Sequence, residues 1–348
     1  MPLSSNKLRL TVGCLIGVLF LYLALRNVDF AQMWEALKEA NYWWLLLVVP
    51  VVFLSHFLRA WRWRYLLDPI TRLDMTSLFS SLIIGYMANI FMPAHLGEIL
   101  RAYVLGRKRA ISASSVFATI VLERIIDVFV LLGLMVWAIL IYPFPGWIKN
   151  AGYIMLGGSV GLLILLILLK ISYYRIRPFL EMGLRPLPEH MRAKARTAVE
   201  RFIDGILPLR TPFDYVTVIL LSLLMWACYG LTFFLTLQAF DFVDAYNLPW
   251  SASLILLVIT TIGVVVPSSP GYVGTYHYLC QVSLAMFGVP ASPALSFAAA
   301  IHAVSFLPVL IAGLVFSYYE GVEVFQTKER LDRGIVEAGD PKETSLPE

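Results

Sequence analysis

Five charged side chains fall within stretches of the chain that are otherwise apolar. Glu98 and Arg101 are three residues apart, and the other three form the run Glu123-Arg124-Ile-Ile-Asp127. Positions i and i+3 or i+4 share a helix face, so each set should lie on one side of a helix. A charge at the centre of a membrane helix costs roughly 2.5–3.5 kcal/mol, so these side chains must be paired or hydrated. The pattern predicts a polar lining between two helices.

Two interpretations of this lining differ in what the charges do. In the first, the charges only neutralise one another and fix the packing of the two helices, as buried ion networks can. In the second, the arginines and the loose backbone amides between Pro93 and Gly97 hold a phosphate-bearing headgroup. Asn89 and His95 would then add hydrogen bonds, and His277 is a further candidate for the same cavity. The spacing alone leaves both interpretations open.

Signatures of common enzymes are missing from the sequence. The patterns G-x-S-x-G, H-E-x-x-H and G-x-x-x-x-G-K-[ST] do not occur. The three cysteines lie in apolar runs without C-x-x-C spacing, which suggests neither a disulfide framework nor a zinc site. We therefore expect no catalytic residue, no cofactor and no metal. His56 and His302 are expected to be satisfied within the helix packing.

The composition places the chain among membrane proteins. Hydrophobic residues make up 59% of the 348 residues, charged residues 14%, and the mean hydropathy is +0.77. Most of the 27 lysines and arginines fall in alternate loops, which by the positive-inside rule places both termini in the cytoplasm. Arg59 and Arg62, beside two tryptophans, are predicted to anchor the second span at the inner headgroup level.

The apolar runs predict an all-α polytopic membrane protein with about six full spans and two re-entrant, broken helical hairpins. Ser77–Phe91 reaches only about 22 Å as a helix, short of a hydrocarbon core about 30 Å thick, so Pro93 and Gly97 should form the tip of the first hairpin. The second is expected to break at Pro267, Pro270, Gly271 and Gly274, although its length also allows two full crossings. The full spans are predicted at Leu10–Leu25, Tyr42–Leu58, Ala113–Tyr142, Ala151–Ile171, Asp214–Ala239 and Ala294–Tyr319.

The two halves of the chain repeat the same order of elements. Each reads as span, surface segment, span, broken hairpin and span, and each tip carries Pro-x-x-x-Gly. The first half starts inside and the second outside, so the repeats have inverted topology, which points to a midplane transport site. We expect one membrane domain over 1–319, with repeats at about 8–146 and 147–319, and a polar cytoplasmic tail over 320–348. A basic surface helix over Glu189–Ile206 should contact anionic lipid.

Four pieces of the sequence carry a family resemblance: Asn89 to Arg101 (N-I-F-M-P-A-H-L-G-E-I-L-R), Glu123-Arg124-Ile-Ile-Asp127, Arg59-Ala-Trp-Arg-Trp63 and Pro270-Gly-Tyr-Val-Gly274. They resemble the membrane domain of lysylphosphatidylglycerol synthases, which defines a family of flippase-like proteins, over about Leu10 to Tyr319. The resemblance implies lipid translocation between leaflets, with the two hairpins meeting around a headgroup cavity. We expect this protein to lack the soluble aminoacyl-transferase domain of the synthases, and His277 stands where the family usually has an acidic residue.

The leading hypothesis is a lipid flippase of the cytoplasmic (inner) membrane. Its expected partner is a membrane lipid, either an anionic phospholipid or a polyprenyl-phosphate lipid; a homo-oligomer stays open, and no nucleic acid is expected. One alternative is a membrane-embedded enzyme acting on lipid headgroups, with Glu123 and Asp127 as a general acid/base couple. Another is a non-transporting partner that recruits a lipid-modifying enzyme through the basic segment before Pro212.

Overall fold

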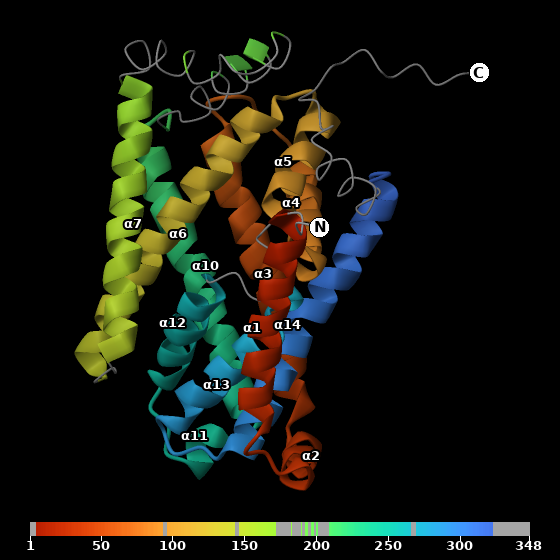
Figure 1. Cartoon of the computed structure of the whole chain (residues 1–348), viewed down its shortest axis with the longest axis vertical. Coiled ribbons are helices and arrows are strands. Elements are labelled where there is room, and N and C mark those ends of the chain that lie inside the picture. The colour runs from red at the N-terminus through yellow and green to blue at the C-terminus, as the bar shows by residue number, and fades with distance from the viewer. Residues whose placement is uncertain are drawn as a thin grey trace.

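The protein is built from α-helices, which confirms the predicted class (Figure 1). This computed structural model describes residues 5–92, 96–142, 146–171, 209–265 and 269–322, with isolated positions between 172 and 208, and no strand occurs within them. The predicted basic helix over Glu189–Ile206 and the polar tail beyond Val322 lie largely or wholly outside the described residues.

Long apolar helices form the frame of the molecule. Four described helices are long and apolar enough to cross a bilayer: α3 (Tyr42–Leu67), α6 (Ala113–Ile141), α10 (Pro212–Ala239) and α14 (Ala291–Tyr319). Two more, α1 (Ser5–Leu25) and α7 (Gly146–Ile171), have 21 and 26 residues. Their lengths of about 32 and 39 Å also exceed the hydrocarbon thickness of about 30 Å. These helices give the predicted multi-pass architecture.

The short helix α2 (Phe30–Glu39) follows α1 and lies across the end of the bundle, in the place of the first predicted surface segment (Figure 1). It bends by 84° from α1 and has no buried residue. Asp29 caps it by accepting a hydrogen bond from the backbone of Ala31 at 2.8 Å. We call this end of the molecule the α2 face, and the opposite end, where helix α5 (Leu96–Arg109) ends, the α5 face. The four-residue helix α11 (Phe242–Ala245) also lies at the α2 face.

The first predicted hairpin is present and enters from the α5 face (Figure 1). Its helices α4 (Met75–Phe91) and α5 (Leu96–Arg109) have 17 and 14 residues, about 26 and 21 Å of helix, too short to cross. Asn89 joins them, because its Oδ1 accepts a hydrogen bond from the backbone N–H of Gly97 at 2.8 Å. Pro93 and His95 lie outside the described residues.

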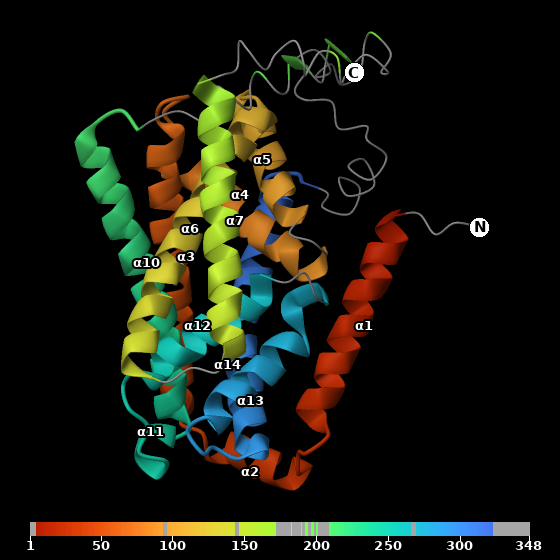
Figure 2. The ribbon, with the colours of Figure 1, turned by 60° about the vertical axis from the view of Figure 1, so that its left-hand side comes forward.

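The second hairpin enters from the α2 face (Figure 2). It consists of α12 (Ala252–Val265), the 3-10 turn η1 (Pro270–Tyr272) and α13 (Thr275–Ala285). Its two α-helices have 14 and 11 residues, so each spans only about 17–21 Å. The segment is therefore re-entrant, and the alternative of two full crossings is wrong. Pro267 lies outside the described part of the chain.

The two hairpins pack against long helices from both halves of the chain. Helices α3 and α10 pack along each other, α14 packs on α4, and α6 packs on α12. Helix α5 also packs on α6 and α13 on α14, so each hairpin lies against the last long helix of both halves. The tips meet at mid-depth, where a Cβ placed on Gly271 would touch the side chain of Ile90 at 3.6 Å. The exact boundaries of the two repeats stay a prediction.

Candidate functional site

An ion-pair network occupies the middle of the bundle. It joins α3, α5 and α6 through four guanidinium groups and three carboxylates, which leaves one net positive charge. Apolar helices surround the network, and the bilayer interior offers no water to hydrate its charges. The ion pairs therefore have to stabilise these charges instead. Its members are Arg59, Arg62, Glu98, Arg101, Glu123, Arg124 and Asp127.

Glu123 is the centre of this network. Its carboxylate is fully buried and accepts hydrogen bonds from Arg59 Nη1 at 2.6 Å, Arg124 Nη2 at 2.7 Å and Arg101 Nη2 at 3.0 Å. Arg101 Nη1 donates to the same carboxylate at 3.2 Å, so this pair is bidentate. Glu123 of α6 therefore holds an arginine of α3 and an arginine of the hairpin helix α5 at the same carboxylate.

Asp127, one turn further along α6, binds the two arginines of α3. Arg59 Nη1 donates to it at 2.8 Å and Arg62 Nη1 at 2.6 Å. The same two arginines also reach α10, where Arg62 Nη1 donates to Ser222 at 2.9 Å and Arg59 Nη2 donates to the Tyr229 hydroxyl at 3.0 Å. The second carboxylate thus holds α3, α6 and α10 together.

The positions of Arg59 and Arg62 correct the sequence analysis. They were predicted to anchor the second span among lipid headgroups, but Arg59 is 3% exposed and Arg62 is not exposed. The physical reason is that α3 does not end at Leu58; it continues to Leu67 and turns both side chains toward α6. A count of basic residues along the chain cannot distinguish a solvated arginine from one whose counter-ion lies on another helix.

Arg101 and Arg124 differ in how far they are accessible. The side chain of Arg101 is 3% exposed, and its guanidinium lies 3.5 Å from the centroid of the Trp63 ring, in cation–π geometry. The side chain of Arg124 is 37% exposed, and its Nε lies 3.3 Å from Glu98, whose side chain is 19% exposed. Of the four arginines in the network, Arg124 therefore has the most exposed side chain.

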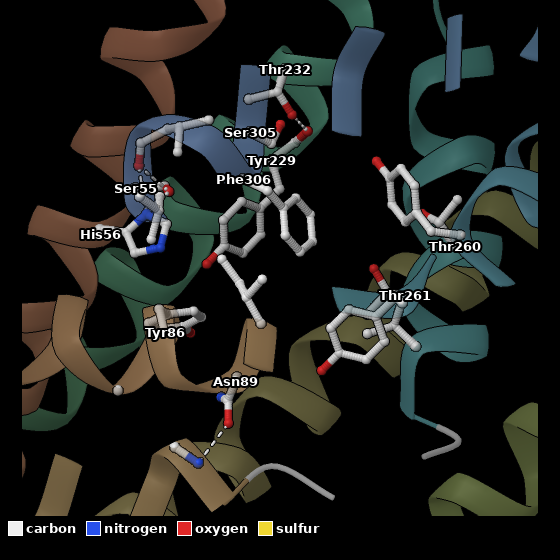
Figure 3. Close-up of a pocket in the computed structure, with 18 of the residues that line it drawn as sticks. Ser55, His56, Tyr86, Asn89, Tyr229, Thr232, Thr260, Thr261, Ser305 and Phe306 are labelled. Carbon is white, nitrogen blue, oxygen red and sulfur yellow. Dashed lines mark hydrogen bonds between the residues drawn. The ribbon is translucent and has the colours of Figure 1, made fainter. Parts of the chain in front are cut away.

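A cavity of about 320 Å³ lies beside the network, where the two hairpin tips meet. Three charged side chains, Glu98, Arg101 and Arg124, form part of its wall. Hydroxyl and amide groups form much of the rest, and Figure 3 shows them converging from several helices. The polar residues in this second group are Ser55, Tyr86, Asn89, Tyr229, Thr232, Thr260, Thr261, Tyr272, Tyr276 and Ser305.

The predicted site residues fall into three groups in the structure. Glu98, Arg101, Arg124, Asn89 and Gly97 line the cavity. Behind this wall lie Glu123, Asp127, Arg59 and Arg62, which are buried in ion pairs. The tip residues Gly271, Gly274 and Pro270 shape the second hairpin, and Pro93, His95 and Pro267 lie outside the described residues.

The histidines lie around the second tip and along α3. His277 is not among the described residues that line the cavity; its ring contacts that of His302, with the centroids 4.9 Å apart. His302 Nε2 is 2.9 Å from the carbonyl oxygen of Gly271. His56 Nδ1 is 2.8 Å from the Val52 carbonyl oxygen, although its ring also lines the cavity. His56 and His302 thus have the backbone partners that were expected of packing residues.

The hydroxyl-bearing wall on α10 and α12 was not predicted from the sequence. Tyr229 and Thr232 come from α10, and Thr260 and Thr261 come from α12. The only local signal was an adjacent pair of threonines in a helix that is otherwise apolar. Within the described chain, no cluster of His, Cys, Asp and Glu could hold a metal ion.

The wall and its arginines lie within a region that matches known proteins. Residues 10–313 match the family described as the lysylphosphatidylglycerol synthase TM region. A UPF0104 membrane protein of Methanothermobacter thermautotrophicus is 26% identical over 330 residues, covering 89% of this chain and 95% of that relative. Glycosyltransferase AglD of Haloferax volcanii is 27% identical over 134 residues, which is 38% of this chain but only 22% of that protein.

No solved structure matches the chain significantly. The family match, in contrast, extends over both hairpins, the ion-pair network and the cavity wall. The chain therefore belongs to the family of the lysylphosphatidylglycerol synthase transmembrane region.

Proposed function

We propose that the protein is a flippase that moves a lipid with a phosphate-bearing headgroup between the leaflets of the cytoplasmic membrane. One observation carries the proposal: a cavity with the accessible Arg124 in its wall lies between the tips of two hairpins that enter from opposite faces. Paired interrupted helices of this kind mark midplane transport sites. The proposal is specific to the headgroup, because the acyl chains would stay in the surrounding bilayer.

The charge of the site favours an anion. Four arginines face three carboxylates, and Glu123 and Asp127 are already saturated by their ion pairs. The surplus positive charge is exposed at Arg124, and a guanidinium group can bind two phosphate oxygens at once. A phosphate entering the cavity would therefore meet a partly exposed arginine that the buried Glu123 holds at 2.7 Å and that Glu98 approaches at 3.3 Å.

The proposed orientation follows from the basic residues at the α5 face. Arg107, Lys108 and Arg109 end α5, and basic loops lie on the cytoplasmic side of membrane proteins. The first hairpin would then enter from the cytoplasm and the second from outside. Both termini would be cytoplasmic.

The geometry does not favour the alternative of an enzyme that uses Glu123 and Asp127 as an acid/base couple. A general base must come within hydrogen-bond reach of its substrate. Neither carboxylate is among the described residues that line the cavity, and both are occupied by arginines. The name of the glycosyltransferase relative adds no support, since the match covers only 22% of that protein.

Reconstitution tests the proposal. Purified protein in vesicles should accelerate the crossing of fluorescently labelled anionic lipids over that in empty vesicles. Arg124→Gln should lower the rate by about tenfold or more, since a charge-assisted pair is lost. The matched control is Arg64→Gln, which removes the same charge from an exposed side chain of α3.

Two results would contradict the proposal. One is a crossing rate equal to that of empty vesicles for phospholipids and polyprenyl phosphates alike. The other is a rate in Arg124→Gln that equals the rate in Arg64→Gln. The thermal unfolding midpoint in detergent separates a loss of transport from a loss of folding.

A further inference from the structure

The two walls of the cavity differ in chemistry, and this difference bears on the substrate class. Resting on the proposed function, we infer that the cavity accepts an anionic lipid headgroup that continues beyond its phosphate as an uncharged, hydroxyl-rich group, such as glycerol or one sugar. It does not accept a headgroup that carries an amine. The inference covers both diacylglycerol and polyprenol carriers, because their headgroups share this chemistry.

The charged wall has no partner to offer an ammonium group. Among the described residues that line the cavity, Glu98 is the one carboxylate, and its Oε1 lies 3.3 Å from Arg124 Nε. Arg101 adds a second positive charge beside it. An amine-bearing headgroup with its phosphate at Arg124 would extend its ammonium toward the uncharged wall on α10 and α12, where no carboxylate among the described lining residues can pair with it, and an unpaired charge in a poorly hydrated site is unfavourable. A phosphate, in contrast, is attracted by the guanidinium groups of Arg101 and Arg124.

The second wall offers hydrogen-bond acceptors. Thr232 Oγ1 donates its proton to the carbonyl oxygen of Tyr229 at 2.7 Å, and Thr260 Oγ1 donates to that of Leu256 at 2.6 Å. Ser55 Oγ is engaged in the same way by the Val52 carbonyl at 2.7 Å. A hydroxyl whose proton is committed still presents lone pairs. These groups can therefore accept hydrogen bonds from the hydroxyls of a ligand, but they cannot donate those protons to a phosphate.

The two walls come from different helices: the charged residues lie on α5 and α6, and the threonines lie on α10 and α12. Figure 3 shows Thr260 and Thr261 on one side and Tyr86 and Asn89 on the other. A ligand with its phosphate at Arg124 would extend its remaining headgroup toward α10 and α12, which supply Thr232 and Thr260. The arrangement matches a headgroup that is negative at one end and hydroxyl-bearing at the other.

The volume limits the size of the hydroxyl-bearing group. The cavity holds about 320 Å³, near the lower end of the roughly 300–1,000 Å³ of small-molecule sites. This suits a phosphate with glycerol or one sugar ring and excludes an oligosaccharide from the enclosed space.

A binding measurement tests the inference independently of transport. The full chain in detergent is titrated with dihexanoyl lipids that differ only in headgroup: phosphatidylglycerol, phosphatidic acid, phosphatidylethanolamine and phosphatidylcholine. A short-chain polyprenyl phosphate carrying one hexose forms the fifth arm. The readout is the shift of the thermal unfolding midpoint with lipid concentration, which yields an apparent Kd.

We expect phosphatidylglycerol or the polyprenyl hexose phosphate to bind about tenfold more tightly than the other three lipids, the size expected when one or two hydrogen bonds are lost. Whichever of the two binds more tightly identifies the carrier, and either result supports the inference. Equal binding of phosphatidylethanolamine would overturn the exclusion of amines. Equal binding of phosphatidic acid would overturn the role of the hydroxyl-bearing group, and no binding of any lipid would overturn both.

A double variant addresses the hydroxyl-bearing wall directly. Thr260→Val with Thr261→Val keeps the side-chain shape and removes both hydroxyls, so the preference for phosphatidylglycerol over phosphatidic acid should fall toward equality. The control is Thr217→Val, the same change at a half-buried position of α10 that is not among the described residues lining the cavity. An unchanged preference in a double variant that still folds would contradict the inference.

Binding and transport can fail separately. Selective binding without lipid crossing in vesicles would contradict the proposed flippase function but support the inference about the headgroup that the cavity binds. Crossing of phosphatidylglycerol and phosphatidylethanolamine at equal rates, with equal binding, would leave the flippase and remove the inference.

Discussion

The two re-entrant hairpins have the same shape but are held in place by different forces. The first carries Glu98 and Arg101 and is fixed by ion pairs to α6. The second has no Asp, Glu, Lys or Arg anywhere between Ala252 and Ala285. The difference shows that one tip can supply the charge of a site while the other supplies only shape and hydrogen bonds.

Close backbone contacts hold the second hairpin. Gly274 lies against the carbonyl oxygen of Gly17 and the backbone of Leu21 on α1. Gln281 Nε2 donates to the carbonyl oxygen of Ala24, also on α1, at 2.9 Å. Helix α1 thus clamps the second hairpin through glycine contacts and one side-chain hydrogen bond, without any charge.

The largest loss of stability is expected when the ion pairs that hold the charged hairpin are broken. Glu123→Gln leaves Arg59, Arg101 and Arg124 without the carboxylate they share, and losing one partner of a buried ion network costs about 3–5 kcal/mol. The thermal unfolding midpoint in detergent should fall steeply. The control is Glu35→Gln on α2, whose exposed pair with Lys38 contributes at most about 1 kcal/mol. Similar small shifts in both variants would show that the network does not hold the first hairpin.

A smaller effect is expected from Gly274→Ala in the neutral hairpin. The residue has φ of 91°, and a Cβ there would also collide with the backbone of α1. The backbone strain alone costs about 1–3 kcal/mol. Gly288→Ala is the matched control, because Gly288 has φ of 81° but no atom within 4 Å of the added Cβ. The excess loss of unfolding free energy in Gly274→Ala measures the contact with α1, and equal losses would show that α1 is not a clamp.

The smallest effect concerns the open end of the charged hairpin at the α5 face. Glu320, just after α14, accepts hydrogen bonds from Ser80 of α4 at 2.8 Å and from Lys108 of α5. Burial raises the pKa of Glu320, but the hydrogen bonds from Lys108 and Ser80 and the charges of Lys108 and Arg109 more than offset it, so its pKa lies below the usual value. The ionised carboxylate therefore stabilises the folded state above the usual glutamate pKa.

Glu320→Gln should consequently lower the unfolding free energy at neutral pH by at most about 1 kcal/mol. The difference from the wild type should vanish as the pH falls through the lowered pKa of Glu320, because the carboxyl group is then protonated in the folded protein too. Thermal unfolding of the wild type and of Glu320→Gln at neutral and acidic pH measures this difference in stability. A difference that persists in acid would exclude the charge as its cause.

Much of the fold could be predicted because its signals are local. A run of apolar residues broken by Pro93 and too short to cross a bilayer predicts a re-entrant hairpin wherever the rest of the chain lies. Asp29 before an amphipathic run likewise predicts the start of α2, and its side chain caps that helix. The charged residues of the site could also be predicted, because a charged residue within an apolar run is recognisable from the sequence alone and its burial in a membrane costs free energy unless it is paired.

The sequence by itself thus determined the helical class, both broken hairpins and the charged residues that the interior must neutralise. Only the tertiary structure decided which charge pairs with which, since Arg59 finds Glu123 across 64 residues of chain. It also decided that Arg124 is accessible while Arg101 is enclosed, and that threonines of α10 and α12 complete the cavity. Helix periodicity reports the face on which a side chain lies, but not which other helix meets that face. That depends on how the apolar surfaces of all the helices pack together.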